Sequence, residues 1–91
     1  MLVLSGEFLA TGQSDTIPVY GDFNIEITGI SAGGSVDLQR KLPDSISFKT
    51  VETITADCSK RGLEPEYGTV YRFDCTDGGG STIKYRLSKS R

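Results

Sequence analysis

Histidine is absent from this chain of 91 residues, and cysteine occurs only twice. Without histidine there is no imidazole base for a serine or cysteine nucleophile, which argues against the Ser-His-Asp and Cys-His classes of catalytic site. Cys58 and Cys75 do not form a Cys-x-x-Cys pair, so a zinc site built from cysteine and histidine is also disfavoured. Sequence leaves a disulfide between them open. We expect free thiols, with Cys75 packed as a small apolar side chain.

Long apolar runs and helical patterns are missing as well. No stretch approaches the roughly 20 apolar residues that span a bilayer. The N-terminal run MLVLSGEFLATG lacks the basic start and the long apolar core of a signal peptide. No window repeats apolar residues at helical spacing over ten or more positions. We therefore expect no membrane partner, no secretion, and use in the cytoplasm or in an assembled particle.

Charged groups are nearly balanced, with ten Lys and Arg against twelve Asp and Glu. Nucleic-acid-binding domains are usually strongly basic, so we expect no nucleic-acid partner. Most tyrosines and phenylalanines fit core positions, and no aromatic row alternates with basic residues as in an RNA-stacking surface. The carboxylates are scattered singly, and the glycines at 78–80 lack the Lys-Ser/Thr of a phosphate loop. We predict a protein that is not an enzyme, with no catalytic residue, no metal site and no cofactor.

Glycine and proline are the strongest positive signals, because eleven glycines and three prolines divide the chain into short runs rich in Val, Ile, Thr, Phe and Tyr. This pattern is typical of an all-β sandwich or small barrel. We predict one domain over residues 1–91, a small antiparallel β-sandwich of six to eight short strands, with a jelly roll as one form of it. The candidate strands are residues 2–11, 16–20, 22–28, 35–41 and 47–56, with two more in the C-terminal stretch. Because only 36% of residues are hydrophobic, the core should be thin or supported by partner subunits.

Two of these candidate strands depart from regular alternation. Pro18 cannot donate a hydrogen bond to a neighbouring strand, so its segment should lie at a sheet edge or at a bend. In residues 47–56, Phe48 and Ile54 share one face whereas Val51 points to the other. Either both faces are partly buried or a β-bulge resets the alternation, and the sequence does not choose between them.

Residues 57–68, with the sequence DCSKRGLEPEYG, form the longest segment without strand alternation, and we predict a loop there. Leu63 and Tyr67 are its apolar residues, set among charged ones. Because loops often carry functional contacts, these two side chains are candidates for partner binding. The alternative is that they close one end of the sandwich.

The C-terminal stretch YRFDCTDGGGSTIKYRLSKSR alternates on both sides of a glycine turn and predicts a β-hairpin. In that register Arg72 lies opposite Arg86 on the polar face, with Lys84 beside them, and like charges placed opposite each other are unfavourable. Arg72, Lys84 and Arg86 are therefore candidates for binding an acidic partner. The alternative is that an acidic residue on a neighbouring strand, such as Glu26, neutralises them within the fold.

Five short motifs follow one another in the C-terminal part of the chain. They are V-x-L-Q-R at 36–40, V-E-T-I-T-A at 51–56, a Glu-Pro segment at 64–66, G-x-x-Y-R-F at 68–73 and R-L-S at 86–88. Together they resemble small β-rich proteins encoded in the structural gene clusters of tailed bacteriophages. The D-G-G-x-x-W turn of those proteins is absent here, and the chain contains no tryptophan.

The resemblance implies a virion structural protein assembled in the host cytoplasm. The first expectation is a capsid decoration (cement) protein that forms homo-oligomers and binds the major capsid protein or other virion proteins. A head–tail or tail component is one alternative, and a carbohydrate-binding or host-recognition module is another. The N-terminal segment MLVL could add a strand to a partner's sheet, or could be the first strand of the domain itself.

Overall fold

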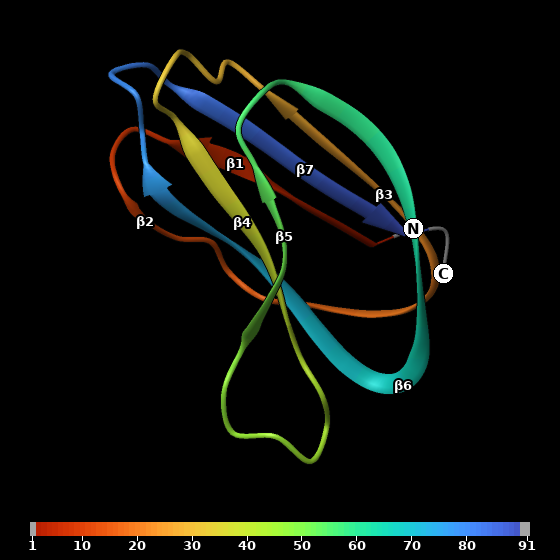
Figure 1. Ribbon diagram of the computed structural model, residues 1–91. Coiled ribbons are helices and arrows are strands. Elements are labelled where there is room, and N and C mark those ends of the chain that lie inside the picture. The colour runs from red at the N-terminus through yellow and green to blue at the C-terminus, as the bar shows by residue number, and fades with distance from the viewer. Residues whose placement is uncertain (1, 90–91) are drawn as a thin grey trace.

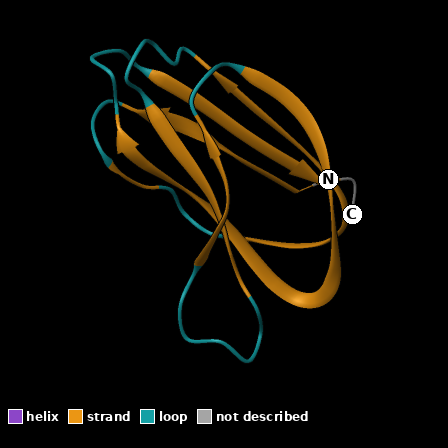
Figure 2. Cartoon of the chain, in the orientation of Figure 1, coloured by secondary structure: helices purple, strands orange, loops and turns teal. Residues whose placement is uncertain are grey.

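The computed structural model describes residues 2–89, which form seven β-strands and no helix (Figures 1 and 2). The strands are β1 (Leu2–Phe8), β2 (Gly12–Gln13), β3 (Ile17–Thr28), β4 (Ser35–Lys41), β5 (Lys49–Ile54), β6 (Cys58–Asp77) and β7 (Ile83–Lys89). The prediction of a small all-β domain with six to eight strands is confirmed. Residues 1, 90 and 91, which the predicted domain also includes, lie outside the described residues.

All strand pairs are antiparallel, and the strands follow the order β1-β7-β3-β6-β4-β5, with β2 beside β6. This sheet folds over on itself because β3 and β6 are long and bent (Figure 1). Their pairing shifts register between Val19 and Gly21, where the two strands pass from one layer to the other. The first layer contains β1, β7, the second part of β3 and the first part of β6. The second layer contains β5, β4, the second part of β6, β2 and the start of β3.

The core lies between these two layers and is built by side chains that meet from opposite layers. The ring of Phe73 on β6 lies 5.3 Å from that of Tyr85 on β7, centroid to centroid. The rings of Phe23 on β3 and Tyr71 on β6 lie 5.0 Å apart. Each large side chain buried in this way contributes about 1.5–3 kcal/mol to folding.

The predicted C-terminal hairpin is wrong. The second part of β6 pairs with β2, β3 and β4, whereas β7 pairs with β1 and β3, and residues 78–82 connect the two layers. Alternation shows which face of a strand is buried, but it does not identify the neighbouring strand. Phe73 and Tyr85 do share the core as predicted, but they meet across it. Arg72 and Arg86 therefore do not lie opposite each other.

The predicted loop at residues 57–68 is also wrong, because most of this segment is the first part of β6. Its alternation is hard to see because the inward positions are filled by Cys58, Lys60, Gly62 and Glu64 instead of large apolar side chains. Phe23 lies opposite Gly62 and covers it, and a Cβ at Gly62 would lie only 2.5 Å from Cζ of the Phe23 ring. An aromatic ring that covers a glycine on the next strand is a recognised way to stabilise a sheet edge.

Other strand predictions fare better. Residues 35–41 form β4 as predicted, while the two candidate strands at 16–20 and 22–28 are joined into β3. Pro18 lies in the part of β3 that pairs only with β6, so it is at a sheet edge, as expected. The broken alternation of residues 47–56 coincides with a β-bulge or similar irregularity. The pairing of β5 with β4 shifts register between Leu38 and Gln39 of β4. The described part of the N-terminal segment, residues 2–4, is part of β1, within the protein's own sheet.

We predict that Gly62→Ala lowers the free energy of unfolding by about 1–3 kcal/mol, because the new methyl group displaces the ring of Phe23. Gly78→Ala is the matched control, since the nearest atom to its Cβ would be 4.0 Å away. Urea unfolding followed by tyrosine fluorescence measures both variants. Equal effects at the two positions would contradict the packing of Phe23 over Gly62.

Candidate functional site

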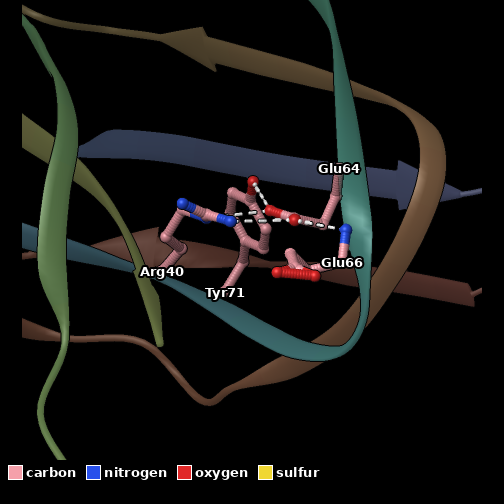
Figure 3. A network of polar contacts seen from close by, with 4 residues as sticks. All are labelled: Arg40, Glu64, Glu66 and Tyr71. Atoms are coloured by element: carbon pink, nitrogen blue, oxygen red, sulfur yellow. Dashed lines mark hydrogen bonds and ion pairs between the residues drawn. The ribbon is translucent and has the colours of Figure 1, made fainter. Parts of the chain in front are cut away.

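The carboxylate of Glu64 makes more hydrogen bonds than any other side-chain group in the described part of the chain (Figure 3). This residue is only 1% exposed. Arg40 donates from Nε to Oε1 at 2.8 Å and from Nη2 to Oε2 at 2.9 Å. The hydroxyl of Tyr71 donates to Oε1 at 2.6 Å, and the backbone amide of Glu66 donates to Oε2 at 2.8 Å. A paired arginine contact of this geometry is among the stronger polar contacts in proteins.

This network closes the bend of β6. Glu64 lies at the end of the first part of the strand, Tyr71 lies in the second part, and Arg40 is the register partner of Tyr71 on β4. Inward residues have even numbers before the bend, as at Gly62 and Glu64, and odd numbers after it, as at Tyr71. The network therefore fixes the place where the alternation changes and the chain crosses between layers.

The electrostatics of the network keep it charged at neutral pH. Burial alone would raise the pKa of Glu64, but the hydrogen bonds from Arg40, Tyr71 and the Glu66 amide outweigh burial and hold that pKa below its ordinary value. The hydrogen bond to Glu64 raises the pKa of Arg40. Burial, together with the neighbouring carboxylate, raises the pKa of the Tyr71 hydroxyl. Since four donors already occupy the Glu64 oxygens, this carboxylate is suited to a structural role and not to accepting a proton from a substrate.

Two exposed tyrosines lie beside this bend. Tyr20 is 50% exposed and Tyr67 is 81% exposed, and their rings are 5.5 Å apart in an edge-to-face arrangement. They belong to a surface groove, here called the aromatic groove, which is lined by Leu2, Pro18, Val19, Tyr20, Tyr67, Gly68, Thr69 and Lys89. The Oγ1 atom of Thr69 is buried and has no hydrogen-bond partner among residues 2–89. The aromatic groove thus presents two exposed rings, whereas the Thr69 hydroxyl beneath it is buried.

Backbone geometry turns Tyr67 outward. The next residue, Gly68, has a φ of +88°, which side-chain-bearing residues rarely adopt. A Cβ at Gly68 would also lie 3.3 Å from Cβ of Pro43. Glu64 holds the chain on one side of this turn and Thr69 re-enters the core on the other, so the exposed position of Tyr67 follows from the buried network.

Three of the predicted partner-binding residues share one surface, the outer face of the first layer. Lys84 and Arg86 are outward positions of β7, and Leu63 is an outward position of β6 that is 66% exposed. In the sheet register Lys84 lies opposite Glu7, and Arg86 lies opposite Glu26. The neutralising neighbour considered from the sequence is therefore present beside Arg86.

Arg72 does not join them, because it lies on the outer face of the second layer. Its Nε donates to Oε1 of Gln39 at 2.8 Å, and its Nη1 donates to Oε1 of Gln13 at 3.3 Å. Its guanidinium carbon lies 3.9 Å from the centroid of the Phe48 ring, a cation–π contact. Arg72 is thus occupied within its own layer and points away from Lys84.

Among the five predicted partner-binding residues, only Tyr67 belongs to the aromatic groove. The sequence reading missed Tyr20, because tyrosines in strands were assigned mainly to the core. Pro18, two residues earlier on the same face, was the available signal that this part of β3 is an exposed edge.

The remaining candidate groups have ordinary surroundings. Both cysteines are free thiols, as expected, and burial raises the pKa of Cys75. Within residues 2–89, no three Cys, Asp or Glu side chains gather closely enough to hold a metal ion. This part of the chain also contains no helix with the length and apolar character needed to cross a membrane.

Neither a scan of protein-family models nor a search of curated proteins found a match to this chain.

We predict that Arg40→Met lowers the free energy of unfolding by about 3 kcal/mol, because it leaves the buried Glu64 carboxylate without its cation. This is the low end of the range for buried pairs, since the Arg40 side chain is 29% exposed. Lys60→Met is the control, because it breaks an exposed ion pair with Glu52 and should change the stability little. Chemical unfolding of the three proteins measures the difference, and equal losses in both variants would contradict the role of the network.

Acid should weaken the fold through Glu64. Because its pKa is lower in the folded state than the ordinary value of 4.5, the stabilisation is present above that pH and is lost as the pH falls through the folded-state pKa. We expect the free energy of unfolding to fall between about pH 5 and pH 2 more steeply in the wild type than in Glu64→Gln, which cannot ionise. Unfolding curves across this range give the two slopes, and identical slopes would exclude Glu64 as the responsible group.

Proposed function

We propose that this protein is a non-enzymatic virion structural protein, a capsid decoration (cement) protein that binds the assembled head shell. The aromatic groove is the observation that carries the proposal, and the resemblance of the C-terminal motifs gives the class of partner. The partner is the major capsid protein or another virion protein exposed on the shell.

The composition of the aromatic groove supports protein binding. Tyrosine is enriched among the residues that dominate binding energies, because its ring buries a large area while its hydroxyl still forms hydrogen bonds. Tyr20 and Tyr67 are already in contact with each other, so fewer side-chain conformations have to be restricted on binding.

The outer face of the first layer can supply a weaker, second contact. Leu63 gives it an exposed apolar side chain, and Lys84 and Arg86 give it positive charges flanked by acids. Charges at the margin of an interface affect the association rate and the salt dependence more than the affinity. A decoration protein can function with moderate single contacts, because many copies on one shell stabilise it together.

A carbohydrate-binding or host-recognition module is the second candidate, and the same exposed tyrosines favour it. Sugars often pack on flat aromatic surfaces, but the planes of Tyr20 and Tyr67 are 77° apart, so the two rings do not form one platform. The edge-to-face arrangement fits a protruding side chain of a protein partner better. For this reason the shell-binding function is preferred.

We predict that the double variant Tyr20→Ser with Tyr67→Ser binds heads at least about ten-fold more weakly than the wild type, because the aromatic groove loses both rings. Ile46→Ser is the matched control, since it removes a fully exposed apolar side chain from the loop between β4 and β5. Co-sedimentation with purified phage heads that lack the protein measures the affinity, and unfolding curves confirm that each variant is folded.

Three results of these binding experiments would be informative. Saturable binding to heads that the double variant loses supports the proposal. Binding to purified tails and not to heads would make the protein a tail component. Binding to a glycan array alone would favour host recognition and overturn the decoration function.

A further inference from the structure

β1 is an open edge of the sheet. It stands at the end of the strand order and pairs only with β7. No other backbone or side-chain hydrogen bond within residues 2–89 reaches it. The amide groups on its outer side are therefore free to pair with another strand, which is a property that folded proteins usually suppress.

The other edges of the fold carry features that hinder pairing with another strand. The edge at the start of β3 contains Pro18 and is continued by β2, a strand of only two residues. The edge at β5 carries Lys49 and has a register shift against β4. The edge at the first part of β6 carries Arg61 and Lys60, and Lys60 is paired with Glu52 across the gap to β5. Proline, lysine and irregular pairing are the usual devices against edge-to-edge association.

β1 has none of these devices. Its seven residues, LVLSGEF, include no proline, no lysine or arginine, and no register shift against β7. Leu2 and Val3 are 43% and 44% exposed. Glu7 is the one charged residue of the strand, and it lies beside Lys84 on β7. The contrast with the other edges indicates that this edge is kept open for a partner.

We propose that this partner is the β1 strand of a second copy, paired antiparallel about a two-fold axis at Ser5. This register pairs every residue of the strand, because Ser5 is the midpoint of Leu2–Phe8. It joins the first layers of the two copies into one continuous sheet. A two-fold axis gives each copy the same contact, as is usual in homodimers.

The strand is complementary to itself in this register. On the inward face Leu2 lies opposite Phe8 of the second copy, and Leu4 lies opposite its Gly6, which the Tyr85 ring covers, so apolar groups meet at both positions. On the outward face Glu7 lies opposite Val3, and no two like charges face each other. The two residues of each pair are both even-numbered or both odd-numbered. Residues whose backbone N–H and C=O groups point away from β7 therefore face residues of the same kind on the second copy, as antiparallel pairing requires. An extended segment of an unrelated protein would match β1 only by chance, whereas a second copy carries this match itself.

Ser5→Lys tests the proposal, because it places two ammonium groups against each other at the axis. Ser5 is exposed on the outer face, so the fold has room for the longer side chain. Ser59→Lys is the matched control, since Ser59 is exposed on the same face at the opposite edge of the first layer. Sedimentation equilibrium of the full chain gives the mass of each variant.

We expect the wild type and Ser59→Lys to reach about twice the 9.8 kDa of one chain, and Ser5→Lys to remain at the mass of one chain. Ser5→Glu should also be monomeric, and an equal mixture of Ser5→Lys and Ser5→Glu should recover the dimer, because opposite charges then meet at the axis. A wild type that stays monomeric at about 100 μM would overturn the proposal. So would an equal effect of lysine at positions 5 and 59, or a mixture that stays monomeric.

This inference does not depend on the function proposed above. The mass is measured without heads, and a monomeric wild type that still binds heads would overturn the dimer alone. A dimer that ignores heads would overturn the decoration function alone.

Discussion

The buried carboxylate of Glu64 is the constraint on which the rest of the structure depends. An ionised carboxylate withdrawn from water is costly unless its oxygens are satisfied, and here Arg40, Tyr71 and the Glu66 amide satisfy them together. The donors come from β4 and from both sides of the bend in β6. The carboxylate can therefore be accommodated only when the bend is closed and the second layer is in place, which couples the charge of one side chain to the folding of both layers.

The exposed features follow from this buried one. In the short segment between Glu64 and Thr69, the Glu66 amide bonds to the Glu64 carboxylate and Gly68 supplies a left-handed turn. Tyr67 is thereby directed outward against Tyr20, while Tyr71 is directed inward against Phe23. The aromatic groove and the core thus lie on the outer and inner sides of the same bend. The hydrogen bonds to the buried Glu64 carboxylate hold this bend and so determine the position of the exposed tyrosine.

Much of the local structure could be predicted from the sequence, because alternation directly reports which face of a strand is buried. β4 follows from that rule, and the edge position of Pro18 follows from the missing N–H donor of proline. The neighbours of a strand do not follow from it, and the C-terminal hairpin was wrong because Phe73 and Tyr85 meet across the core instead of within one layer. The first part of β6 was missed because Gly62 and Glu64 occupy inward positions. Gly62 fits there because the ring of Phe23 covers it, and Glu64 fits there because hydrogen bonds satisfy its carboxylate, and neither contact is visible in the sequence. For the candidate site, Tyr67 was found from its surroundings in the sequence, whereas Tyr20 could not be recognised without knowing that its edge is exposed.

The strand order also has a consequence for synthesis. Of the seven described strands β1 is synthesised first, yet it pairs only with β7, which is synthesised last of the seven and lies between β1 and β3. Pairings between such distant segments form late, because closing the long loop costs conformational entropy before the pairing can stabilise the fold. A growing chain therefore has no ordered β1 edge to offer to its neighbours on the same messenger RNA. The β1 edge becomes ordered only after β7 has been synthesised, so the strand order itself protects nascent chains from premature association.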